Sequence, residues 1–581
     1  MDEILKTKVG KSVKGFNWIE KFAEKKKIEE IINNYSLNYF LAKAVVCRDI
    51  GLDSIKNFFD PKIKNIIPNP SSLLGIDNAT KEIVSRIVNN KKIGFFGDFD
   101  VDGITSTAIF CLFFKELELQ FDYYIPDRIN EGYGPNTTAI EKLYNDSNCD
   151  LIVTLDCGIT SSEVLNNAKK KGIDIIVVDH HKQSKELPDA VSIINPNQNN
   201  DNSKLYNLAA VGVTFMLLIS VRRELLKINF FPKQKIPNLI EYLDLVALGT
   251  ICDVVPQDIY NRSILTTGLK VFNQTKNKGI KSLINISGLE GKHIDEGHLG
   301  FFIGPRINAG GRLGDPNLGV ELLLSDDEIR TSLLAEKLND LNSKRKKIEK
   351  KIEIEAIDLV DEKDNIVCVH NMNWHPGVIG IVASRLVDRF LKPVIVISED
   401  EQSCKGSCRS IGEFDIGEAV NLAYELGILK KGGGHKMAAG LTIKKERIDD
   451  FKTFLKSYKL DKFNKNKYYD FQIRLSSINK KLYQDLKKLG PFGSRNPKPT
   501  ILIKDCFFKF AKMVGNNHVS CLLSDMYGNT IKAISFKANE NKLGRHLLKN
   551  NGKKHDVLGN LDSNYWNGES KLQIQIVDII F

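Results

Sequence analysis

The sequence contains no apolar run of the length that crosses a membrane, which needs about 20 consecutive apolar residues. Its first residues, Met-Asp-Glu-Ile-Leu-Lys, also lack the apolar core of a secretory signal. These two absences argue against a membrane-spanning or exported protein. We therefore expect a cytoplasmic protein without a membrane partner.

Closely spaced cysteines are also lacking. The ten cysteines are scattered, and several of them lie in apolar surroundings, which is typical of reduced, buried thiols in a cytosolic protein. Cys404 and Cys408 form the only close pair, and no second pair lies nearby. Because a structural zinc site needs about four ligands of this kind, we do not expect zinc here.

The chain of 581 residues is too long for a single hydrophobic core, so we expect three or four domains. A hydrophobic content of 42% and a charged content of 27% are ordinary for a globular protein. The net charge of +11 suits a polyanionic partner, although part of the excess can reflect an Asn/Lys-rich background.

The first 75 residues predict a small helical lead-in, because helical patterns alternate there with Pro and Asn loops. From residue 76 to residue 325 strands and helices alternate. Apolar runs at 93–96, 151–155 and 173–178 predict buried strands, and the weakly charged segment 105–117 predicts a buried helix. This alternation favours the α/β class with a parallel sheet.

All three strands end in polar residues, at the edge of the sheet where open α/β folds bind ligands. Residues 97–103, Gly-Asp-Phe-Asp-Val-Asp-Gly, place three carboxylates on alternate positions, where extended side chains point the same way and need a cation. The alternative is an acidic turn with a helix N-cap. The other two strands end in Asp-Cys-Gly at 156–158 and Asp-His-His at 179–181.

Another buried acid lies in segment 242–250, where Asp244 stands inside an apolar, helix-like run. A lone Asp there costs free energy unless it is paired or binds a metal. Asp253 is more exposed by its pattern, and we interpret it as a candidate helix cap.

Carboxylates with one or two imidazoles suit Mn²⁺ or Mg²⁺ better than structural Zn²⁺. The acids outnumber what one ion needs, so a pair of divalent cations that hydrolyses a phosphoester is the better match. The candidate set is Asp98, Asp100, Asp102, Asp156, Asp179, His180, His181 and Asp244.

Residues 326–360 predict one long connecting helix, since they are charged, periodic and free of Gly and Pro. Residues 361–455 show a second α/β pattern. Two segments in it, 406–410 and 432–435, predict glycine-containing loops whose N–H groups approach a phosphate, although a plain flexible turn explains either one equally well.

Residues 460–581 predict a β-rich domain with five or more short strands, a small barrel or sandwich. Lysines and phenylalanines alternate at 507–512. Bases stack on aromatic side chains in basic grooves, which favours single-strand binding. The alternative is that these phenylalanines form the barrel core.

In their order along the chain, these motifs resemble the DHH phosphoesterase superfamily. This resemblance rests on the Asp-His-His triplet at 179–181 and on the two segments before it, 97–103 and 156–158. A second resemblance, to the companion DHHA1 domain, rests on residues 432–440, Gly-Gly-Gly-His-Lys-Met-Ala-Ala-Gly. Within the superfamily, further motifs are similar to the RecJ family of single-strand-specific 5′→3′ DNA exonucleases: Gly-Pro-Arg-Ile-Asn-Ala at 304–309, Trp-His-Pro-Gly-Val-Ile-Gly at 374–380, Ser-Cys-Arg-Ser at 407–410 and Gly-Pro-Phe-Gly at 490–493.

The resemblance implies a catalytic site with two divalent cations, Mn²⁺ or Mg²⁺. Their ligands would be Asp100, Asp102, Asp156, His180 and Asp244, with Asp156 bridging the ions.

Many relatives carry a metal-binding His four residues before the first of these aspartates. Phe96 occupies that place here, and Asp98 is the candidate to substitute for the missing ligand. His181 would contact the scissile phosphate, and Asp179 would fix the tautomer of a neighbouring His.

The resemblance also implies two sets of DNA-binding residues: Arg306, His375, Gly434 and His435 on the backbone, and Arg128, Ser407 and Arg409 on the 5′ end. Arg suits a terminal phosphate because it donates two hydrogen bonds at once. The family places its two α/β domains, DHH and DHHA1, around a cleft that admits one strand, and adds an oligonucleotide-binding barrel, the OB-fold.

The resemblance therefore implies a metal-dependent exonuclease of recombination and repair that releases 5′-mononucleotides. A monomer working beside single-strand-binding protein and a RecQ-type helicase is expected. A phosphodiesterase acting on oligoribonucleotides or cyclic dinucleotides is the alternative enzyme, and it would not need the barrel or the 5′-end residues. A non-catalytic single-strand-binding scaffold is the third reading, and the intact acids and His180 argue against it.

Overall fold

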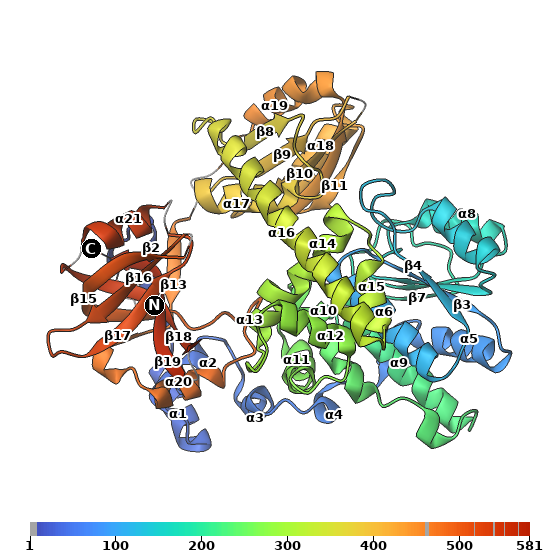
Figure 1. Cartoon of the computed structure of the whole chain (residues 1–581), viewed down its shortest axis with the longest axis horizontal. Helices are drawn as coiled ribbons and strands as arrows, with labels where there is room; N and C mark the ends of the chain where they lie inside the picture. Colours follow the sequence, from blue (N-terminus) through green and yellow to red (C-terminus); the bar gives the residue numbers. More distant parts are fainter. Residues whose placement is uncertain are drawn as a thin grey trace. The chain divides into compact units, whose positions relative to one another are not determined.

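The computed structural model describes residues 8–401, 403–458, 460, 464–515, 517–538, 541–550, 552–566 and 569–580 (Figure 1). It forms two compact units. Unit 1 contains the described residues of 1–66, 256–263 and 464–581, and unit 2 contains those of 67–255 and 264–463. No helix within the described residues is both long and apolar enough to span a membrane.

The first sheet of unit 2 is parallel throughout, as the sequence predicts. Its strand order is β4-β3-β5-β6-β7, and the three central strands are fully buried because both faces are covered by helices. Register pairs Phe95 with Val153, and Thr154 with Val177. The strands are β3 (Ile93–Gly97), β4 (Phe121–Tyr124), β5 (Leu151–Leu155), β6 (Ile175–Val178) and β7 (Ser192–Ile194).

Helix α6 (Val101–Glu116) is buried on nearly all sides, because α9 (Ala210–Lys227) and α10 (Leu243–Cys252) pack against it. The close approach of α10 requires Gly249, where a Cβ would collide with the Thr105 hydroxyl. The other helical segments around this sheet are η2 (Pro70–Ser72), α5 (Ile76–Val88), α7 (Thr137–Glu141), η3 (Lys142–Asp146), α8 (Ser162–Lys170), η4 (Lys233–Lys235) and η5 (Leu239–Tyr242).

A helical layer follows α10 and leads to the connecting helix. Its segments are α11 (Ile259–Phe272), α12 (Lys278–Ile286), α13 (Glu296–His298), the π-helical η6 (Leu299–Ile303), α14 (Gly304–Leu313) and α15 (Leu318–Leu324). Helix α14 lies beside the long helix α16 (Glu328–Asp358), whose N-terminus is capped by Asp327 (Figure 1). The predicted long helix over 326–360 is thus present.

The second sheet of unit 2 has the order β11-β12-β10-β9-β8, with only β8 and β9 parallel. The two predicted glycine loops are strands instead, because their residues pair in register with β12. The absence of a side chain at Gly434 lets the Ala439 backbone approach closely. The elements are β8 (Val367–Asn371), α17 (Ile379–Phe390), β9 (Val394–Ser398), β10 (Cys404–Arg409), α18 (Ile416–Glu425), β11 (Lys431–His435), β12 (Ala438–Ile443), η7 (Lys445–Arg447) and α19 (Ile448–Lys456).

A buried ion-pair network fastens α16 to α17. Glu349 accepts from Arg345 Nη1 at 2.6 Å and also pairs with Arg385, which donates to Glu353 at 2.5 Å. Glu349 has a side-chain exposure of 1%, so it is the member most dependent on its partners.

Glu349→Ala is expected to lower the free energy of unfolding of unit 2 by about 3 kcal/mol, because it leaves two guanidinium groups without their shared partner. Urea unfolding followed by the fluorescence of Trp374, which packs in the same core, measures this loss. Glu353→Ala is the matched control, with an expected loss below about 1 kcal/mol at its more exposed position. Equal losses of stability in the two variants would contradict the conclusion that Glu349 depends most on its ion-pair partners.

Unit 1 contains the predicted C-terminal barrel. Five strands close a ring in the order β15-β16-β17-β19-β18, since β18 also pairs with β15. Phe508 is buried in the barrel core, whereas Phe510 is exposed. The alternative that these phenylalanines form the core therefore applies to Phe508, and Phe510 remains available for stacking on a base. The elements are β14 (Phe471–Ile473), η8 (Leu475–Ser477), α20 (Lys480–Lys487), β15 (Ile501–Val514), β16 (His518–Ser524), β17 (Thr530–Ser535), α21 (Lys542–Lys549), β18 (Lys554–Trp566) and β19 (Glu569–Ile580).

The sequence predicts a helical lead-in, but the structure shows that this segment also contains two strands. Strand β2 (Asn17–Glu20) pairs with β1 (Lys8–Lys11) and with β13 (Asn466–Tyr469). Ile31 and Leu41 share one core with barrel residues such as Phe508, which explains why both ends of the chain form one unit. The remaining segments are α1 (Lys25–Tyr35), α2 (Tyr39–Val46), η1 (Leu52–Ser54), α3 (Ile55–Phe59) and α4 (Ile63–Ile66).

Candidate metal centre

The carboxyl ends of β3, β5 and β6 lie side by side, because these strands are neighbours in one parallel sheet. Asp98 follows β3, Asp156 follows β5, and Asp179 with its two histidines follows β6. The parallel topology therefore brings together three segments that are separate in the sequence.

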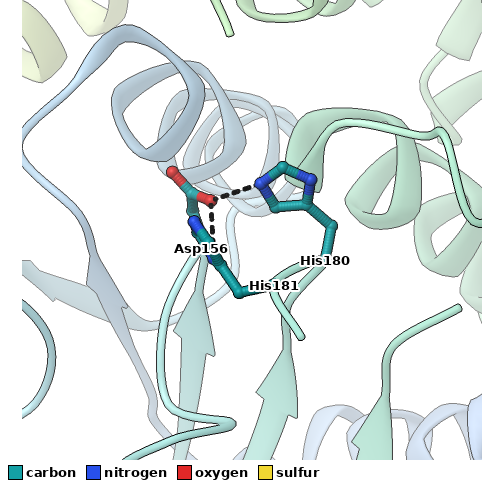
Figure 2. A group of neighbouring side chains, drawn as sticks. All are labelled: Asp156, His180 and His181. Atoms are coloured by element: carbon teal, nitrogen blue, oxygen red, sulfur yellow. Dashed lines mark ion pairs between the residues drawn. The ribbon is translucent and has the colours of Figure 1, made fainter. Parts of the chain in front are cut away.

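The Asp156 carboxylate lies within reach of both histidines (Figure 2). Its Oδ1 is 3.4 Å from His180 Nε2 and 3.9 Å from His181 Nδ1. Asp156 is buried and has a φ of +64°, a left-handed conformation that Asp tolerates better than most residues. A strained backbone at this point fits a residue whose side chain must be aimed at a site.

Three overlapping groups of side chains in the described residues have ligand atoms within 4.8 Å of one another. Asp156 belongs to two of them, and so does His180. The groups are Asp98 with Asp100 and Asp156, Asp156 with His180 and His181, and Asp102 with His180 and Asp253.

Four atoms of this cluster are buried and have no hydrogen-bond partner: Asp98 Oδ1, Asp156 Oδ1, His180 Nε2 and Asp253 Oδ2. A buried polar atom without a partner costs free energy, and four such atoms from four segments converge here. Three are carboxylate oxygens and one is an imidazole nitrogen, the donor set that Mn²⁺ and Mg²⁺ accept. The residues present therefore fit divalent cations.

The electrostatics of the cluster also require positive charge. Burial, reinforced by Asp100, raises the pKa of Asp98 well above its usual range, and burial, reinforced by Asp102, does the same for Asp156. Burial and the charge of Asp100 raise the pKa of Asp102 to about 7. Burial and the charge of Asp102 raise the pKa of Asp253 to about 7, although His180 lowers it. A bound cation would keep these carboxyl groups ionised.

Asp100 and Asp102 are oriented by helix N-termini. Asp100 caps α6, where its Oδ1 accepts from the N–H groups of Asp102 at 2.9 Å and Gly103 at 3.2 Å. Asp102 accepts from Ala210 N at 2.7 Å and Val211 N at 2.8 Å, in the first turn of α9. Asp100 is thus a helix N-cap, as the alternative interpretation predicts, and it also belongs to the group with Asp98 and Asp156.

Asp179 fixes the turn that carries both histidines. Its Oδ1 accepts from His181 Nδ1 at 2.7 Å and from His180 N at 2.7 Å, and its Oδ2 accepts from Ile159 N at 3.0 Å. Burial lowers the pKa of His181, but the hydrogen bond to Asp179 outweighs this effect and raises the pKa to about 9. Tyr133, which the sequence did not single out, donates to the Asp156 carbonyl oxygen at 3.0 Å and lies 3.1 Å from His181 Nδ1.

The structure does not bring Asp244, an expected ligand, together with the other acids. Its Oδ2 accepts from Thr275 Oγ1 at 2.6 Å, and it belongs to none of the three groups. Asp253 belongs to one of these groups instead, and its Oδ2 lies 3.6 Å from His180 Nε2. The two acids occupy opposite ends of α10, about 13 Å apart along the axis by the helical rise, so only one of them reaches the strand ends.

The position occupied by Phe96 contributes no ligand. Its ring is buried and stacks on Tyr124 at 5.8 Å. Asp98, two residues further on, is within the group that contains Asp100 and Asp156. The structure therefore offers Asp98 as the additional oxygen donor on this side.

Arg128 and Arg312 interact electrostatically with acids of the cluster, and Arg409 interacts with these two arginines. The Arg128 guanidinium is 4.9 Å from the Phe99 ring centre, and Arg409 donates to Ser407 Oγ at 3.3 Å. Arg312, which the sequence did not indicate, donates to Gly377 O at 3.0 Å. Burial, followed by the charge of Arg128, lowers the pKa of Arg312 to about 9. Its only signal was its place just beyond the motif at 304–309.

The other predicted DNA-binding residues lie on separate elements. Arg306 on α14 donates to Asn339 Oδ1 at 3.1 Å, and His375 Nδ1 accepts from Gly377 N at 3.1 Å. Gly434 and His435 are exposed on β11, and burial together with the charge of Arg409 lowers the pKa of His435. None of these four belongs to the metal-binding groups in the described part of the chain.

Family models match three parts of the chain: the N-terminal domain of the DHH family at 92–250, the DHHA1 domain at 364–459 and the RecJ OB domain at 469–578. The single-stranded-DNA-specific exonuclease RecJ of Bacillus subtilis is 33% identical over 574 residues, which cover 97% of this chain and 70% of the relative. The enzyme of the same name from Escherichia coli is 34% identical, covering 89% of this chain and 92% of the relative.

Among solved structures, RecJ from Thermus thermophilus in complex with Mn²⁺ is similar, with a TM-score of 0.80 and 26% identity. The match covers 97% of this chain and 78% of that one. A structure of exonuclease RecJ bound to manganese is 31% identical, with a TM-score of 0.58 over 68% of this chain and 95% of that one.

Proposed function

Because the chain belongs to the RecJ family of single-stranded-DNA-specific exonucleases, we propose that it degrades single-stranded DNA from the 5′ end to 5′-mononucleotides, using two divalent cations. The observation that carries this proposal is the convergence of four buried, unpartnered ligand atoms at the ends of neighbouring strands and of α10. An arrangement without cations would leave these atoms unpaired at a high cost in free energy.

The proposed ligands are Asp98, Asp100, Asp102, Asp156, His180 and Asp253, with Asp156 shared between the two ions. When bound, Mn²⁺ or Mg²⁺ in such a set activates a water molecule and stabilises the leaving oxygen of a phosphodiester. The protein's own contribution is to fix the oxygen and nitrogen donors before substrate arrives. Helix N-termini hold Asp100 and Asp102, and the strained backbone aims Asp156.

His181 is proposed to contact the scissile phosphate. Its Nδ1 is held by Asp179, so its Nε2 is the nitrogen left to face a substrate. A proton on Nε2 would let the imidazole donate to an oxygen of an anionic phosphate. The Tyr133 hydroxyl lies 3.1 Å from the same nitrogen, His181 Nδ1.

Arg128, Ser407 and Arg409 are proposed to hold the 5′ terminus, with Arg312 adding charge behind them. Burial and the charge of Arg128 lower the pKa of Arg409, which supports a shared role for the two guanidinium groups. Lys405 donates to Ile129 O at 2.7 Å and so fixes the loop that carries Arg128. A pocket that only a chain end fills explains 5′→3′ polarity.

The remaining proposals follow from the family. The barrel would bind the single strand through aromatic stacking and positive charge, and Arg306, His375, Gly434 and His435 would follow its backbone. We also propose a cytoplasmic monomer that works beside single-strand-binding protein and a RecQ-type helicase in recombination and repair.

The test uses the full chain, Mn²⁺ and single strands labelled at one end and blocked at the other. Release of labelled mononucleotides from a free 5′ end, and protection when the 5′ end is blocked, is the expected result. Digestion from the 3′ end, or of duplex DNA at the same rate, would overturn the proposal.

Asp98→Asn is expected to raise the Mn²⁺ concentration needed for half-maximal activity by about tenfold or more, with activity largely restored at saturating Mn²⁺. The physical reason is that an amide oxygen is a weaker ligand than a carboxylate. A Mn²⁺ titration of the initial rate measures the shift. An unchanged titration curve would show that Asp98 is not a ligand.

A further inference from the structure

Phe301 is the most exposed of the large apolar residues in the described chain, with 80% of its surface accessible. It lies in the π-helical turn η6, beside Phe302, which is 43% exposed. Leu299 and Ile303 take the buried side of this turn, so it presents aromatic rings outward. Short π-helical turns are uncommon and frequently occur at functional sites.

The turn packs directly against the end of α10 that carries Asp253. The Cys252 thiol donates to the Leu299 carbonyl oxygen at 3.9 Å, and a Cβ at Gly304 would collide with the same sulfur. Because Asp253 follows Cys252, Phe301 lies on the segment that borders this side of the metal centre.

The other end of α14 reaches the opposite side of the metal centre. A Cβ at Gly311 would be 2.7 Å from the Phe99 carbonyl oxygen, and Phe99 lies between Asp98 and Asp100 and under Arg128. From Gly304 to Gly311 the helix rises about 10 Å. Helix α14 therefore runs past the carboxylate cluster from the Asp253 side to the 5′-end pocket.

The exposed rings are accompanied by positive charge. Arg306 Nη1 donates to the Phe302 carbonyl oxygen at 2.7 Å, so its guanidinium lies close to the turn. Lys346 on α16 is near Arg306, since burial and the charge of Arg306 lower the pKa of Lys346. An aromatic ring beside cationic side chains is the chemistry that holds single-stranded nucleic acid, with bases on the ring and phosphates on the cations.

We propose that Phe301 is a stacking platform for one base of the single strand, on the 3′ side of the scissile bond. This inference rests on the proposed function, which places the 5′ end at Arg128 and Arg409. The strand then continues along α14 toward Phe301, with its phosphates passing Arg306. Stacking is tolerant of sequence, because every base has a flat face.

The experiment pairs enzyme variants with single strands that lack one base. Oligonucleotides with a single abasic position, scanned from the second to the eighth nucleotide, are digested by the full-length protein, its Phe301→Ala and Phe301→Trp variants, and Ile329→Ala. Ile329 on α16 is the control because it is 75% exposed. The same strands are bound without metal and followed by fluorescence anisotropy, so a binding readout exists besides activity.

For the unaltered chain, one abasic position is expected to lower kcat/KM and affinity about tenfold. Phe301→Ala should lose about tenfold in kcat/KM and affinity on intact DNA, chiefly through a higher KM. Removing the base at the sensitive position should cause no further loss in this variant. Phe301→Trp and Ile329→Ala should behave like the unaltered chain.

An abasic penalty that persists in Phe301→Ala, or normal affinity of that variant for intact DNA, would overturn the inference. Absence of digestion by the unaltered chain would instead overturn the proposed function, while the anisotropy measurements would still decide the role of Phe301.

Discussion

Asp156→Asn is expected to reduce the rate of hydrolysis by about 10³-fold or more while changing single-strand affinity less than about threefold. The carboxylate of Asp156 is shared by two of the three ligand groups, so its loss weakens the hold on both ions. Asn is the appropriate replacement because, like Asp, it tolerates the left-handed φ of +64° at this position. Single-turnover digestion of 5′-labelled strands and anisotropy without metal provide the two measurements.

The control for this variant is Asp174→Asn, since Asp174 is half-buried near the opposite end of β6 and pairs with Arg86 at 2.7 Å. It should digest DNA at a normal rate. Substantial activity in Asp156→Asn would remove the shared role of Asp156. A parallel loss of affinity would point instead to a misfolded sheet edge.

Asp253→Asn and Asp244→Asn are expected to differ by about 10²-fold or more in their rates, although both residues are acids on or next to α10. Asp253 has a buried oxygen without a partner, 3.6 Å from His180. Asp244 is already satisfied by Thr275 at 2.6 Å. Removing the charge of Asp253 should therefore disable the metal centre, whereas Asp244→Asn should keep activity and cost about 1 kcal/mol of stability.

Initial rates over a Mn²⁺ titration, with the urea midpoint of each variant, separate these two effects. As for Asp98→Asn, saturating Mn²⁺ should recover activity in Asp253→Asn, because an amide oxygen is a weaker ligand than a carboxylate, whereas the titration curve of Asp244→Asn should be unshifted. The reverse ranking, with Asp244→Asn inactive and Asp253→Asn active, would show that the ligand is the one expected from the sequence pattern.

The comparison of Asp244 with Asp253 shows where sequence reasoning stops. A buried acid in an apolar helix signals that some partner exists, but the partner of Asp244 is a hydroxyl 31 positions away in the chain. A period of 3.6 residues gives the face of a helix and does not tell which of its ends meets a sheet edge. The DHH strand ends were predictable because parallel topology alone brings them together.

The glycine-rich segments illustrate a different limit. Their composition is equally compatible with a loop and with a strand whose neighbour approaches closely, and only the pairing with β12 decides between them. Arg312 and Phe301 were missed because their surroundings include α10 and the segment between β8 and α17, which are remote from them in the sequence. Strand β2 of the lead-in was missed because one of its two partners, β13, is more than 400 residues away.

The most direct test of the two-metal account is the anomalous scattering of Mn²⁺ in crystals of the full-length protein. The account predicts two peaks that share the Asp156 carboxylate, one toward Asp98 and Asp100 and the other toward Asp102, His180 and Asp253. A single peak, or a peak liganded by Asp244, would contradict it.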